Sequence, residues 1–572
     1  MVDYKEIIGE LLASFMEISR QELSGMIEVP VEEKMGDYAL PCFRLAKAMK
    51  KAPPVIASEM AERLEDHPAF EKVEAVGAYL NFFMKKDLYS REVIQTVLDE
   101  KEKYGRSEQG KGKKVVVEFS SPNIAKPFHI GHIRSTVIGN SIYKIYDYLG
   151  YETIRINHLG DYGTQFGKMI VAYRHWGKRE DVVKAPIDTL LSYFVKFHEE
   201  AESHPELEEE ARKAFFNLEK GNPEEQELWQ WFRDESLKEF NRVYTMLGIE
   251  FDSLAGESFY SDKMDRVVKE LDEKGLLLPS EGAKIVDLEE YKLPPALITK
   301  RDGSTLYITR DIAAAIYRKE TYDFYKNLYI VGNQQILHFQ QWMKIVELMG
   351  YSWANDCVHI PFGLVSLEDG DNLSTRKGKV VFLEDVLRRA VEKTREIILE
   401  KNVNTDNVEE TAAQVGIGAI VFNELSNSRG KDYVFSWDKV LAFEGETGPY
   451  VQYTHARACS ILRNAGEETL DLAKSMDGLD PGYLTGDCGY RLVKLLYSFP
   501  DRVVDAGARY EPSVIARYVV DVAQVFNRFY HEEHILVPDP LERASKVALV
   551  VAAKQVLANG LNLLGVHAPE KM

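Results

Sequence analysis

The sequence predicts an α/β protein whose central domain is a parallel sheet with a helical insertion, preceded by a small α+β domain and followed by a helical bundle. Three observations predict this. A β-rich run, a long helical pattern and a second β-like run follow one another within about 45 residues from residue 113. Residues 175–290 are mostly helical in pattern and acidic, and beyond residue 440 apolar residues recur at helical spacing. At 572 residues, the chain exceeds what one core usually organises.

The N-terminal domain is expected over residues 1–105. It begins with an amphipathic helical pattern, followed by the turn-like GDYALP, a second helical run and the apolar segment VGAYLNFFM. The central domain is expected over 110–440 and the helical domain over 441–572.

Composition narrows the class of protein. The net charge of -20 argues against coating nucleic acid through bulk electrostatics, so any RNA site must be local. No apolar run reaches the roughly 18 residues of a membrane span, and the N-terminus lacks a basic start followed by an apolar core. Four cysteines without CxxC spacing disfavour a disulfide framework and a zinc ribbon. We therefore expect a cytoplasmic protein that does not cross a membrane.

The central domain opens with a βαβ unit. KKVVVEFSS predicts a strand, apolar residues at helical spacing from Ile130 to Leu149 predict a long helix, and ETIRIN predicts a second strand. Such a unit predicts a parallel sheet with a ligand at the carboxyl end of the first strand. After the insertion, LYITR, NLYIVG and VHIPFGLVSL predict further strands.

SSPNIAKPFHIGHIRST lies at that ligand position. A helix N-terminus offers unpaired N–H groups and suits a phosphate, while His129 and His132 add donors on one face and Gly131 leaves room for a flat base or ribose. Fixed donors there would stabilise charge that grows on an attacked α-phosphate, and Lys126 would add a full charge. A pair of structural helix histidines, or a zinc site using His129 and His132, is the alternative.

Further blocks follow in order: NHLGDYGTQFG, VGNQQILHF, NLSTRKGKV, LSNSRGKDYVF, EGETGPYVQYTHAR and the closing LGVHAPEKM. With SSPNIAKPFHIGHIRST, they make nearly the whole chain resemble the class I aminoacyl-tRNA synthetases, and specifically the arginyl-tRNA synthetase family. The resemblance implies a Rossmann-like catalytic domain with a helical insertion at about 175–290, an N-terminal additional tRNA-binding domain and a C-terminal all-helical anticodon-binding bundle.

The implied activity is the ATP-dependent attachment of L-arginine to tRNA(Arg) through an arginyl-adenylate, giving arginyl-tRNA, AMP and pyrophosphate. ATP would enter with Mg²⁺ as a substrate, with no structural metal, and we expect a monomer. The resemblance assigns two sets of substrate residues. The arginine-binding set is Glu118, Asn123, His129, Tyr307, Asp311 and Gln335; the ATP-binding set is His129, Gly131, His132, Ser374, Arg376 and Lys377.

The catalytic set is His129, His132 and Lys126, and it includes a departure from the class pattern. The class has a KMSKS loop whose lysine stabilises pyrophosphate, whereas here Asn372 and Thr375 stand where its lysines would be. Many arginyl enzymes share this departure, and a lysine just ahead of the HIGH element is thought to take over. That position is Lys126 here.

Arginine recognition needs a carboxylate, because a guanidinium pairs with one bidentately. Tyr307 and Asp311 are four residues apart and would share a face of a helix start if the strand ends near Thr309. Without the resemblance, Tyr307 is a half-buried strand residue and Asp311 a helix cap.

For tRNA, the matching positions are partly aromatic, and aromatic rings stack on unpaired bases. From composition alone, Tyr450 and Tyr453 are equally good residues for the core of the helical bundle. The set is Tyr79, Asn81, Tyr450, Tyr453, Arg457, Tyr530 and Met572.

Two other classes share part of the pattern. A small-molecule nucleotidylyltransferase would have the HxGH helix without needing the C-terminal bundle. A catalytically silent RNA-binding relative would keep the bundle and lose the site, and the absent loop lysines favour it. Retention of Asn123, His129, His132, Asp311 and Gln335 together argues against that class.

Overall fold

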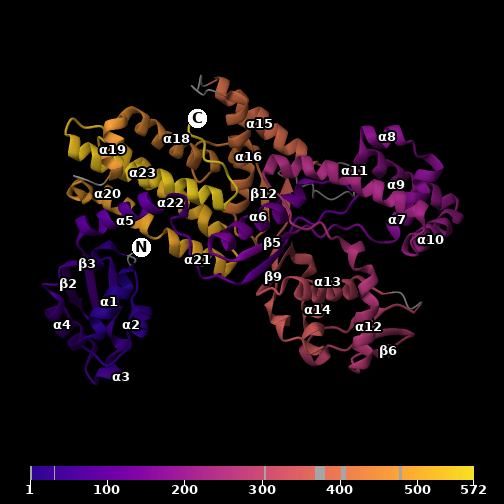
Figure 1. Cartoon of the computed structure of the whole chain (residues 1–572), viewed down its shortest axis with the longest axis horizontal. Coiled ribbons are helices and arrows are strands. Elements are labelled where there is room, and N and C mark those ends of the chain that lie inside the picture. The colour runs from indigo at the N-terminus through magenta and orange to yellow at the C-terminus, as the bar shows by residue number, and fades with distance from the viewer. Residues whose placement is uncertain (1–2, 31, 302–304, 368–380, 401–406, 476–478) are drawn as a thin grey trace. The chain divides into compact units, whose positions relative to one another are not determined.

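The computed structural model describes residues 3–30, 32–301, 305–367, 381–400, 407–475 and 479–572 (Figure 1). It divides the chain into two compact units. The first unit comprises residues 1–104, 457–499 and 521–557, and the second comprises 105–456, 500–520 and 558–572. Each unit is thus assembled from segments far apart in sequence. The domain boundaries expected from the sequence remain a prediction.

The N-terminal segment of the first unit is α+β. Its antiparallel sheet has the order β1-β3-β2. Leu80, Phe82 and Met84 of β3 are buried on one face, and Tyr79, Asn81 and Phe83 alternate with them. The strands are β1 (Tyr38–Pro41), β2 (Phe70–Val76) and β3 (Tyr79–Met84); the helices are α1 (Tyr4–Ala13), α2 (Arg20–Met26), α3 (Ala46–Met49), α4 (Pro53–Leu64) and α5 (Lys86–Glu100).

Aromatic side chains join this segment to the C-terminal helices of the same unit. The ring centroids of Tyr4 and Tyr497 lie 5.7 Å apart, and the Tyr104 hydroxyl donates to the Leu496 carbonyl at 2.9 Å. Lys494 pairs with Asp37 at 3.6 Å. The helices wholly inside these ranges are α19 (Glu467–Ser475) and α20 (Asp487–Tyr497), whereas α18 (Gly448–Ala465), α22 (Ser513–Glu532) and α23 (Pro540–Leu563) contribute residues to both units.

A parallel four-stranded sheet forms the centre of the second unit, with the order β10-β9-β4-β5. The helix α6 (Ile133–Tyr148) connects β4 to β5, which confirms the βαβ unit read from the sequence. Val115, Val116 and Val117 of β4 are fully buried, as expected for a central parallel strand. The strands are β4 (Lys114–Glu118), β5 (Glu152–Ile156), β9 (Lys326–Gly332) and β10 (Cys357–Phe362).

The insertion is helical, as predicted, but not throughout. Its helices are α7 (Thr164–Trp176), α8 (Arg179–Lys184), α9 (Pro186–Ser203), α10 (Glu206–Glu219), α11 (Pro223–Leu247) and α12 (Met264–Glu273) (Figure 1). Three antiparallel strands that the sequence analysis did not predict follow α12: β6 (Leu278–Ser280), β7 (Ala283–Val286) and β8 (Ala296–Thr299). They are too short for their alternation to stand out in the sequence.

The prediction that LYITR is a strand is wrong. Residues 307–310 belong to α13 (Tyr307–Tyr322), whose first turn also holds Asp311. The β-branched residues of LYITR favour a strand locally, but they lead directly into the alanine run Ala313 to Ala315, which favours a helix. The other two runs are strands: NLYIVG lies in β9, and VHIPFGLVSL spans most of β10 and all of β11 (Val365–Leu367).

The remaining helices of the second unit are α14 (Ile336–Leu348), α15 (Leu383–Glu400), α16 (Val408–Ser426), α17 (Trp437–Val440) and most of α21 (Phe499–Arg509). A short strand, β12 (Tyr433–Phe435), pairs in parallel with β11. The C-terminal tail is fixed to α18, because Gln452 donates to the His567 carbonyl and His455 bonds to that of Pro569, both at 2.9 Å. Among the described residues, no helix is both long and apolar enough to cross a membrane.

Candidate active site

The loop after β4 is held in a strained conformation. Ser120, Ser121 and Ala125 have positive φ angles of 70°, 49° and 57°, which cost L-residues about 1 kcal/mol each. Side chains of other elements accept hydrogen bonds from all three backbone N–H groups: Ser135 at 3.0 Å, Asn157 at 3.1 Å and Ser236 at 2.9 Å. The loop therefore presents one fixed shape at the carboxyl end of β4.

The two histidines meet where this loop becomes a helix. His129 caps a short 3-10 helix, Ile130–His132, that continues into α6. The ring centroids of His129 and His132 lie 4.0 Å apart, and the Nδ1 atom of His129 accepts the N–H of Gly131 at 3.1 Å. A Cβ atom on Gly131 would lie 2.9 Å from the His129 ring, so the ring has room in this position only because residue 131 has no side chain.

Both imidazoles are neutral near pH 7. Burial, helped by His129, lowers the pKa of His132 to about 3, and burial also lowers the pKa of His129. Because Nδ1 of neutral His129 accepts a hydrogen bond, its proton is on Nε2. His129 can therefore donate a hydrogen bond without carrying a charge. Lys126, which is exposed three residues earlier, is the cation of this loop.

The chain that follows residue 380 is anchored near the histidines. Ile130 N–H donates to the Val381 carbonyl at 3.1 Å, and Leu383 N–H donates to the Phe128 carbonyl at 2.9 Å. On the other side, β11 ends at Leu367. The predicted ATP residues Ser374, Arg376 and Lys377, together with Asn372 and Thr375, lie outside the described residues.

Two of the predicted arginine residues, Tyr307 and Asp311, contact a histidine that the sequence analysis did not single out. Nε2 of His338 lies 2.5 Å from the Asp311 carboxylate, and its ring centroid lies 4.7 Å from that of Tyr307. Gln335 ends the 3-10 helix immediately before α14, which carries His338. The side chain of Tyr307 is exposed, and that of Asp311 keeps 30% of its surface exposed.

Glu118 and Asn123 are placed differently. Glu118 is buried and pairs with the fully buried Arg318 of α13 at 2.5 Å. Asn123 is exposed and bridges to Gly160, where a Cβ atom would lie 2.0 Å from the Asn123 amide oxygen. Burial is the main cause that raises the pKa of Tyr329 of β9, and the charges of Glu118 and Asp311 raise it further. Both carboxylates therefore act on the same tyrosine.

Another missed residue is Glu257, which begins a 3-10 helix, Glu257–Lys263. It pairs with Arg310 at 2.9 Å, and burial raises its pKa, with Asp311 contributing in the same direction. The Arg310 guanidinium also lies 4.6 Å from the Tyr162 ring centroid. Glu257 lies in none of the blocks quoted from the sequence, whereas His338 lies within VGNQQILHF but was not singled out there.

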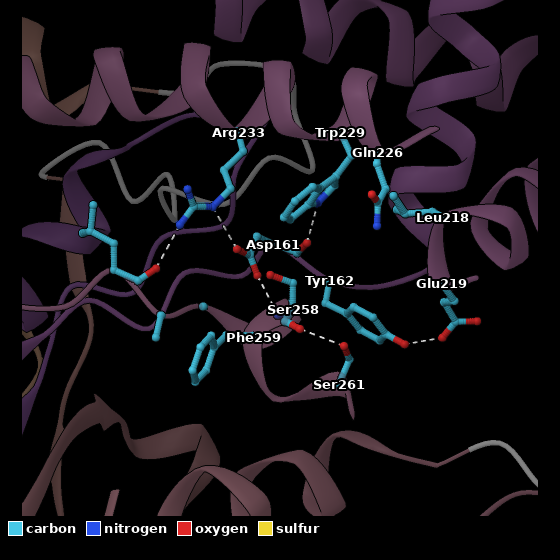
Figure 2. A pocket seen from close by; sticks show the side chains of 13 residues that line it. Asp161, Tyr162, Leu218, Glu219, Gln226, Trp229, Arg233, Ser258, Phe259 and Ser261 are labelled. Carbon is cyan, nitrogen blue, oxygen red and sulfur yellow. Dashed lines mark hydrogen bonds and ion pairs between the residues drawn. The ribbon is translucent and has the colours of Figure 1, made fainter. Parts of the chain in front are cut away.

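A cavity of about 560 Å³ adjoins this cluster through Tyr162. At its wall, the buried Asp161 carboxylate accepts hydrogen bonds from Arg233 at 3.1 Å and from the Ser258 N–H at 2.8 Å (Figure 2). Trp229 donates to the Asp161 carbonyl at 2.8 Å. Asp161 thus ties α11 of the insertion to the 3-10 helix that carries Glu257.

The loop after β4 and Glu118 lie where the strand order of the sheet reverses. From β4, the chain adds β5 on one side and β9 on the other, and open α/β sheets bind ligands at the carboxyl ends of strands beside such a switch point. Glu118 ends β4 and pairs in register with Tyr329 of β9.

Among the described residues, no group of three or more histidine, cysteine, aspartate or glutamate side chains is arranged to hold a metal ion.

The predicted RNA residues of the first unit differ in exposure. Tyr79 is 39% exposed and lies edge-on to Phe43, with ring centroids 6.0 Å apart. Asn81 is 1% exposed, and its amide has no hydrogen-bond partner within the described ranges. Its burial does not favour direct contact with RNA. Arg457 lies 5.1 Å from the ring centroid of Tyr530, which is 40% exposed.

The predicted RNA residues of the second unit are partly exposed. Tyr453 on α18 is 40% exposed, whereas Tyr450, one turn earlier, is half-buried. Met572 is half-buried at the end of the tail that α18 anchors. Their roles remain predictions.

Family models match three consecutive parts of the chain. The description "tRNA synthetases class I (R), catalytic domain" matches residues 93–437, "Arginyl tRNA synthetase N terminal domain" matches 3–84, and "DALR anticodon binding domain" matches 451–572. An arginine–tRNA ligase of Clostridioides difficile is 59% identical over the full length of both chains. The chain belongs to the arginyl-tRNA synthetases of class I.

Other arginyl-tRNA synthetases are similar over comparable lengths. An arginine–tRNA ligase of Halothermothrix orenii is 56% identical over all of both chains. The solved Thermus thermophilus arginyl-tRNA synthetase has a TM-score of 0.83 at 26% identity, and each chain covers 100% of the other. The Plasmodium falciparum arginyl-tRNA synthetase has a TM-score of 0.78 at 25% identity, and the match covers 96% of this chain and 94% of the Plasmodium chain. The predicted fold class is thereby confirmed.

Proposed function

We propose that this arginyl-tRNA synthetase attaches L-arginine to tRNA(Arg) in two steps at the switch point of the parallel sheet. A carboxylate oxygen of arginine attacks the α-phosphorus of ATP, and the bond to the bridging oxygen breaks, so pyrophosphate leaves and arginyl-adenylate remains. A ribose hydroxyl of the tRNA 3′ end then attacks the arginyl carbonyl carbon. AMP leaves, and the hydroxyl proton is lost. The observation that carries the proposal is that two neutral imidazoles lie at the helix mouth that follows β4, while Glu118 at the end of the same strand pairs with Arg318 of α13, the helix that carries Tyr307 and Asp311.

The helix mouth suits the α-phosphate. Negative charge grows on its non-bridging oxygens during attack, and the Nε2–H of His129 is a fixed donor that needs no proton transfer to act. Gly131 has no side chain that would block ATP from reaching this donor. ATP would bring Mg²⁺ bound to its phosphates, as part of the substrate.

Lys126 would supply the positive charge that Asn372 and Thr375 do not. The hydrogen bonds of Val381 and Leu383 to Ile130 and Phe128 support this assignment, because they hold the residues that follow position 380 at the mouth of the same helix. Arg376 and Lys377 of that segment are further candidates for contacts with ATP.

Arginine would be recognised by the cluster at the start of α13. The exposed part of the Asp311 carboxylate can accept the guanidinium, while His338 fixes the other side of that carboxylate. Glu257 provides a second carboxylate close to Asp311. Glu118 and Glu257 differ from Asp311, because arginines balance their charges, Arg318 and Arg310 respectively, and what they offer substrate is a hydrogen-bond acceptor. Asn123 and Gln335 complete the proposed set.

tRNA(Arg) would be bound through both units, at Tyr79 in the N-terminal segment and at Tyr450, Tyr453, Arg457, Tyr530 and Met572 in the C-terminal helices. Exposed tyrosines can stack on unpaired bases. We further propose that the protein acts in the cytoplasm as a monomer.

The test is pyrophosphate exchange with each of the twenty amino acids, with and without tRNA, followed by aminoacylation of tRNA(Arg). We expect arginine alone to support exchange and arginyl-tRNA to form. Exchange without any amino acid would indicate a small-molecule nucleotidylyltransferase. No exchange at all, with tRNA still bound, would indicate a catalytically silent RNA-binding protein.

A further inference from the structure

A buried cluster of charged and polar side chains lies directly behind the histidines. Arg134 of α6 and Glu424 of α16 are both about 1% exposed, and Arg134 Nε lies 2.7 Å from a Glu424 carboxylate oxygen. The Tyr433 hydroxyl donates to the other oxygen at 2.5 Å. The Arg134 guanidinium also lies 5.3 Å from the Tyr433 ring centroid and donates from Nη1 to the Lys431 carbonyl at 2.8 Å.

This cluster connects two parts of the proposed ATP site. Arg134 follows His132 by two residues, in the first turn of α6. Tyr433 begins β12 and pairs in register with Val365 of β11, the strand that ends immediately before residue 368. One set of contacts therefore fixes both the helix mouth and the strand that leads into the NLSTRKG sequence.

Stability alone does not account for such a cluster. Taking two charges out of water costs several kcal/mol per ion, and well-packed apolar residues of similar volume are often as stable or more so. Burial raises the pKa of the Glu424 carboxyl to about 7, against the opposing effect of Arg134. What the cluster adds is direction, since a guanidinium has a fixed set of donor positions, and Arg134 Nη1 and the Tyr433 hydroxyl each donate one hydrogen bond within it.

We propose that Arg134, Glu424 and Tyr433 are positioning residues for amino-acid activation, which fix the first turn of α6, and with it the imidazoles of His129 and His132, relative to β12. This inference rests on the proposed function. None of the three is proposed to contact substrate. A displacement of about 1 Å in a reacting group can cost on the order of 100-fold in rate, so loss of the cluster should appear in the activation rate and not in arginine binding.

The test replaces the pair by apolar residues of similar size, Arg134→Met with Glu424→Leu, which leaves no unpaired buried charge. The matched control is Arg174→Met with Glu225→Leu, a pair at 2.9 Å between α7 and α11 that also includes a buried glutamate. Tyr433→Phe removes a single hydrogen bond. Thermal unfolding shows that each variant is folded, and pyrophosphate exchange gives kcat and the KM values for arginine and ATP.

We expect the apolar pair to lower kcat about 100-fold with the KM for arginine changed less than threefold. Tyr433→Phe should lower kcat about tenfold, and the control should stay near wild type. A folded apolar variant with wild-type kcat would overturn the inference, and so would an equal loss in the control.

A second measurement does not depend on activity. In protein labelled with ¹³C-histidine, NMR titration follows the pKa of the His132 imidazole in wild type and in the apolar variant. A loosened helix mouth admits water, so the lowered pKa should move towards its ordinary value. If it stays lowered, the cluster does not position the imidazoles. If wild type shows no exchange with arginine, the proposed function fails, and this titration still decides the positioning role.

Discussion

Neutrality determines what the two histidines can contribute. A neutral imidazole contributes a hydrogen-bond donor at a fixed position without adding a full charge, and such a donor interacts more strongly as charge builds on the phosphate oxygens. Burial lowers both pKa values, so the two histidines are expected to act as such donors. Lys126, which is exposed, is free to supply the full charge.

We predict that His129→Ala and His132→Ala each lower the activation rate roughly 100-fold or more, because removal of one preorganised donor costs on the order of 3 kcal/mol. The measurement is single-turnover formation of arginyl-adenylate. Circular dichroism checks that the fold is kept. Rates within threefold of wild type for both variants would exclude the phosphate role.

The pH dependence of stability should carry a signature of His132. Its folded pKa of about 3 lies below the ordinary value near 6.5, so between these limits the unfolded chain binds the extra proton. His132 therefore lowers the free energy of unfolding as pH falls from about 6.5 towards 3. Urea unfolding at pH 7.5 and 5.5 should show a smaller loss of stability in His132→Asn than in wild type. An identical loss in both proteins would contradict the lowered pKa.

Asp311 should determine arginine affinity. Asp311→Asn keeps the shape but removes the charge that pairs with a guanidinium, a charged hydrogen bond worth about 1.5–3 kcal/mol, so we expect the KM for arginine to rise roughly 10- to 150-fold. The KM for ATP should change little. His338→Gln serves as the comparison, with a smaller rise because it removes only the partner that orients the carboxylate. An unchanged KM for arginine in Asp311→Asn would place the pocket elsewhere.

Among the elements, the loop between β4 and α6 combines strain with many hydrogen bonds. Three left-handed residues would relax if the side chains of Ser135, Asn157 and Ser236 did not hold their N–H groups. The backbone of this loop and of Val381 to Leu383 is joined by hydrogen bonds, so we propose that Lys126 and the NLSTRKG sequence serve the same phosphates.

We therefore predict that Lys126 and residue 375 are energetically coupled. Lys126→Ala should lower aminoacylation by several orders of magnitude with little effect on arginine affinity, because the charge acts mostly as pyrophosphate leaves. Thr375→Lys in that background should recover part of the rate. The measurement is a four-way cycle of wild type, both single variants and the double variant. Additive effects would exclude a shared role, and a harmless Lys126→Ala would assign the charge to Arg376 or Lys377.

Local patterns predicted the elements whose period is clear. The strand–helix–strand unit from β4 to β5, the helical insertion and the C-terminal helices were all expected, whereas the arginine-binding set with Tyr307, Asp311 and Gln335 came from the family resemblance and stays a prediction. The start of α13 was misassigned because β-branched residues precede its alanine run. Glu257 and Arg318 were missed for another reason: each meets its partner across more than 50 residues, and such contacts leave no spacing to read. His338 lies within VGNQQILHF, three residues after Gln335, and that block was the signal that could have found it.

For the whole molecule, the first unit is built from distant segments, and this predicts which helices lose stability when one segment is removed. The Tyr104 hydroxyl and the rings of Tyr4 and Tyr89 contact the chain around Leu496 and Tyr497. A chain lacking residues 1–104 should therefore lose hydrogen-exchange protection at 457–499 and 521–557, while the sheet β10-β9-β4-β5 keeps its own. Tyr104→Phe, which removes one hydrogen bond, is the mild comparison. Unchanged protection of the C-terminal helices would show that they fold without the N-terminal segment.

The division of the first unit between distant segments also affects synthesis. When the ribosome has completed residues 1–104, the helices that complete this unit, from residue 457 onwards, have not yet been made. Roughly 350 residues intervene, which at about 5–20 residues per second takes on the order of 20–70 s. During that interval the surface around Tyr4 and Tyr89 lacks Tyr497 and its neighbours, so we expect these aromatic side chains to be open to solvent until translation is nearly complete.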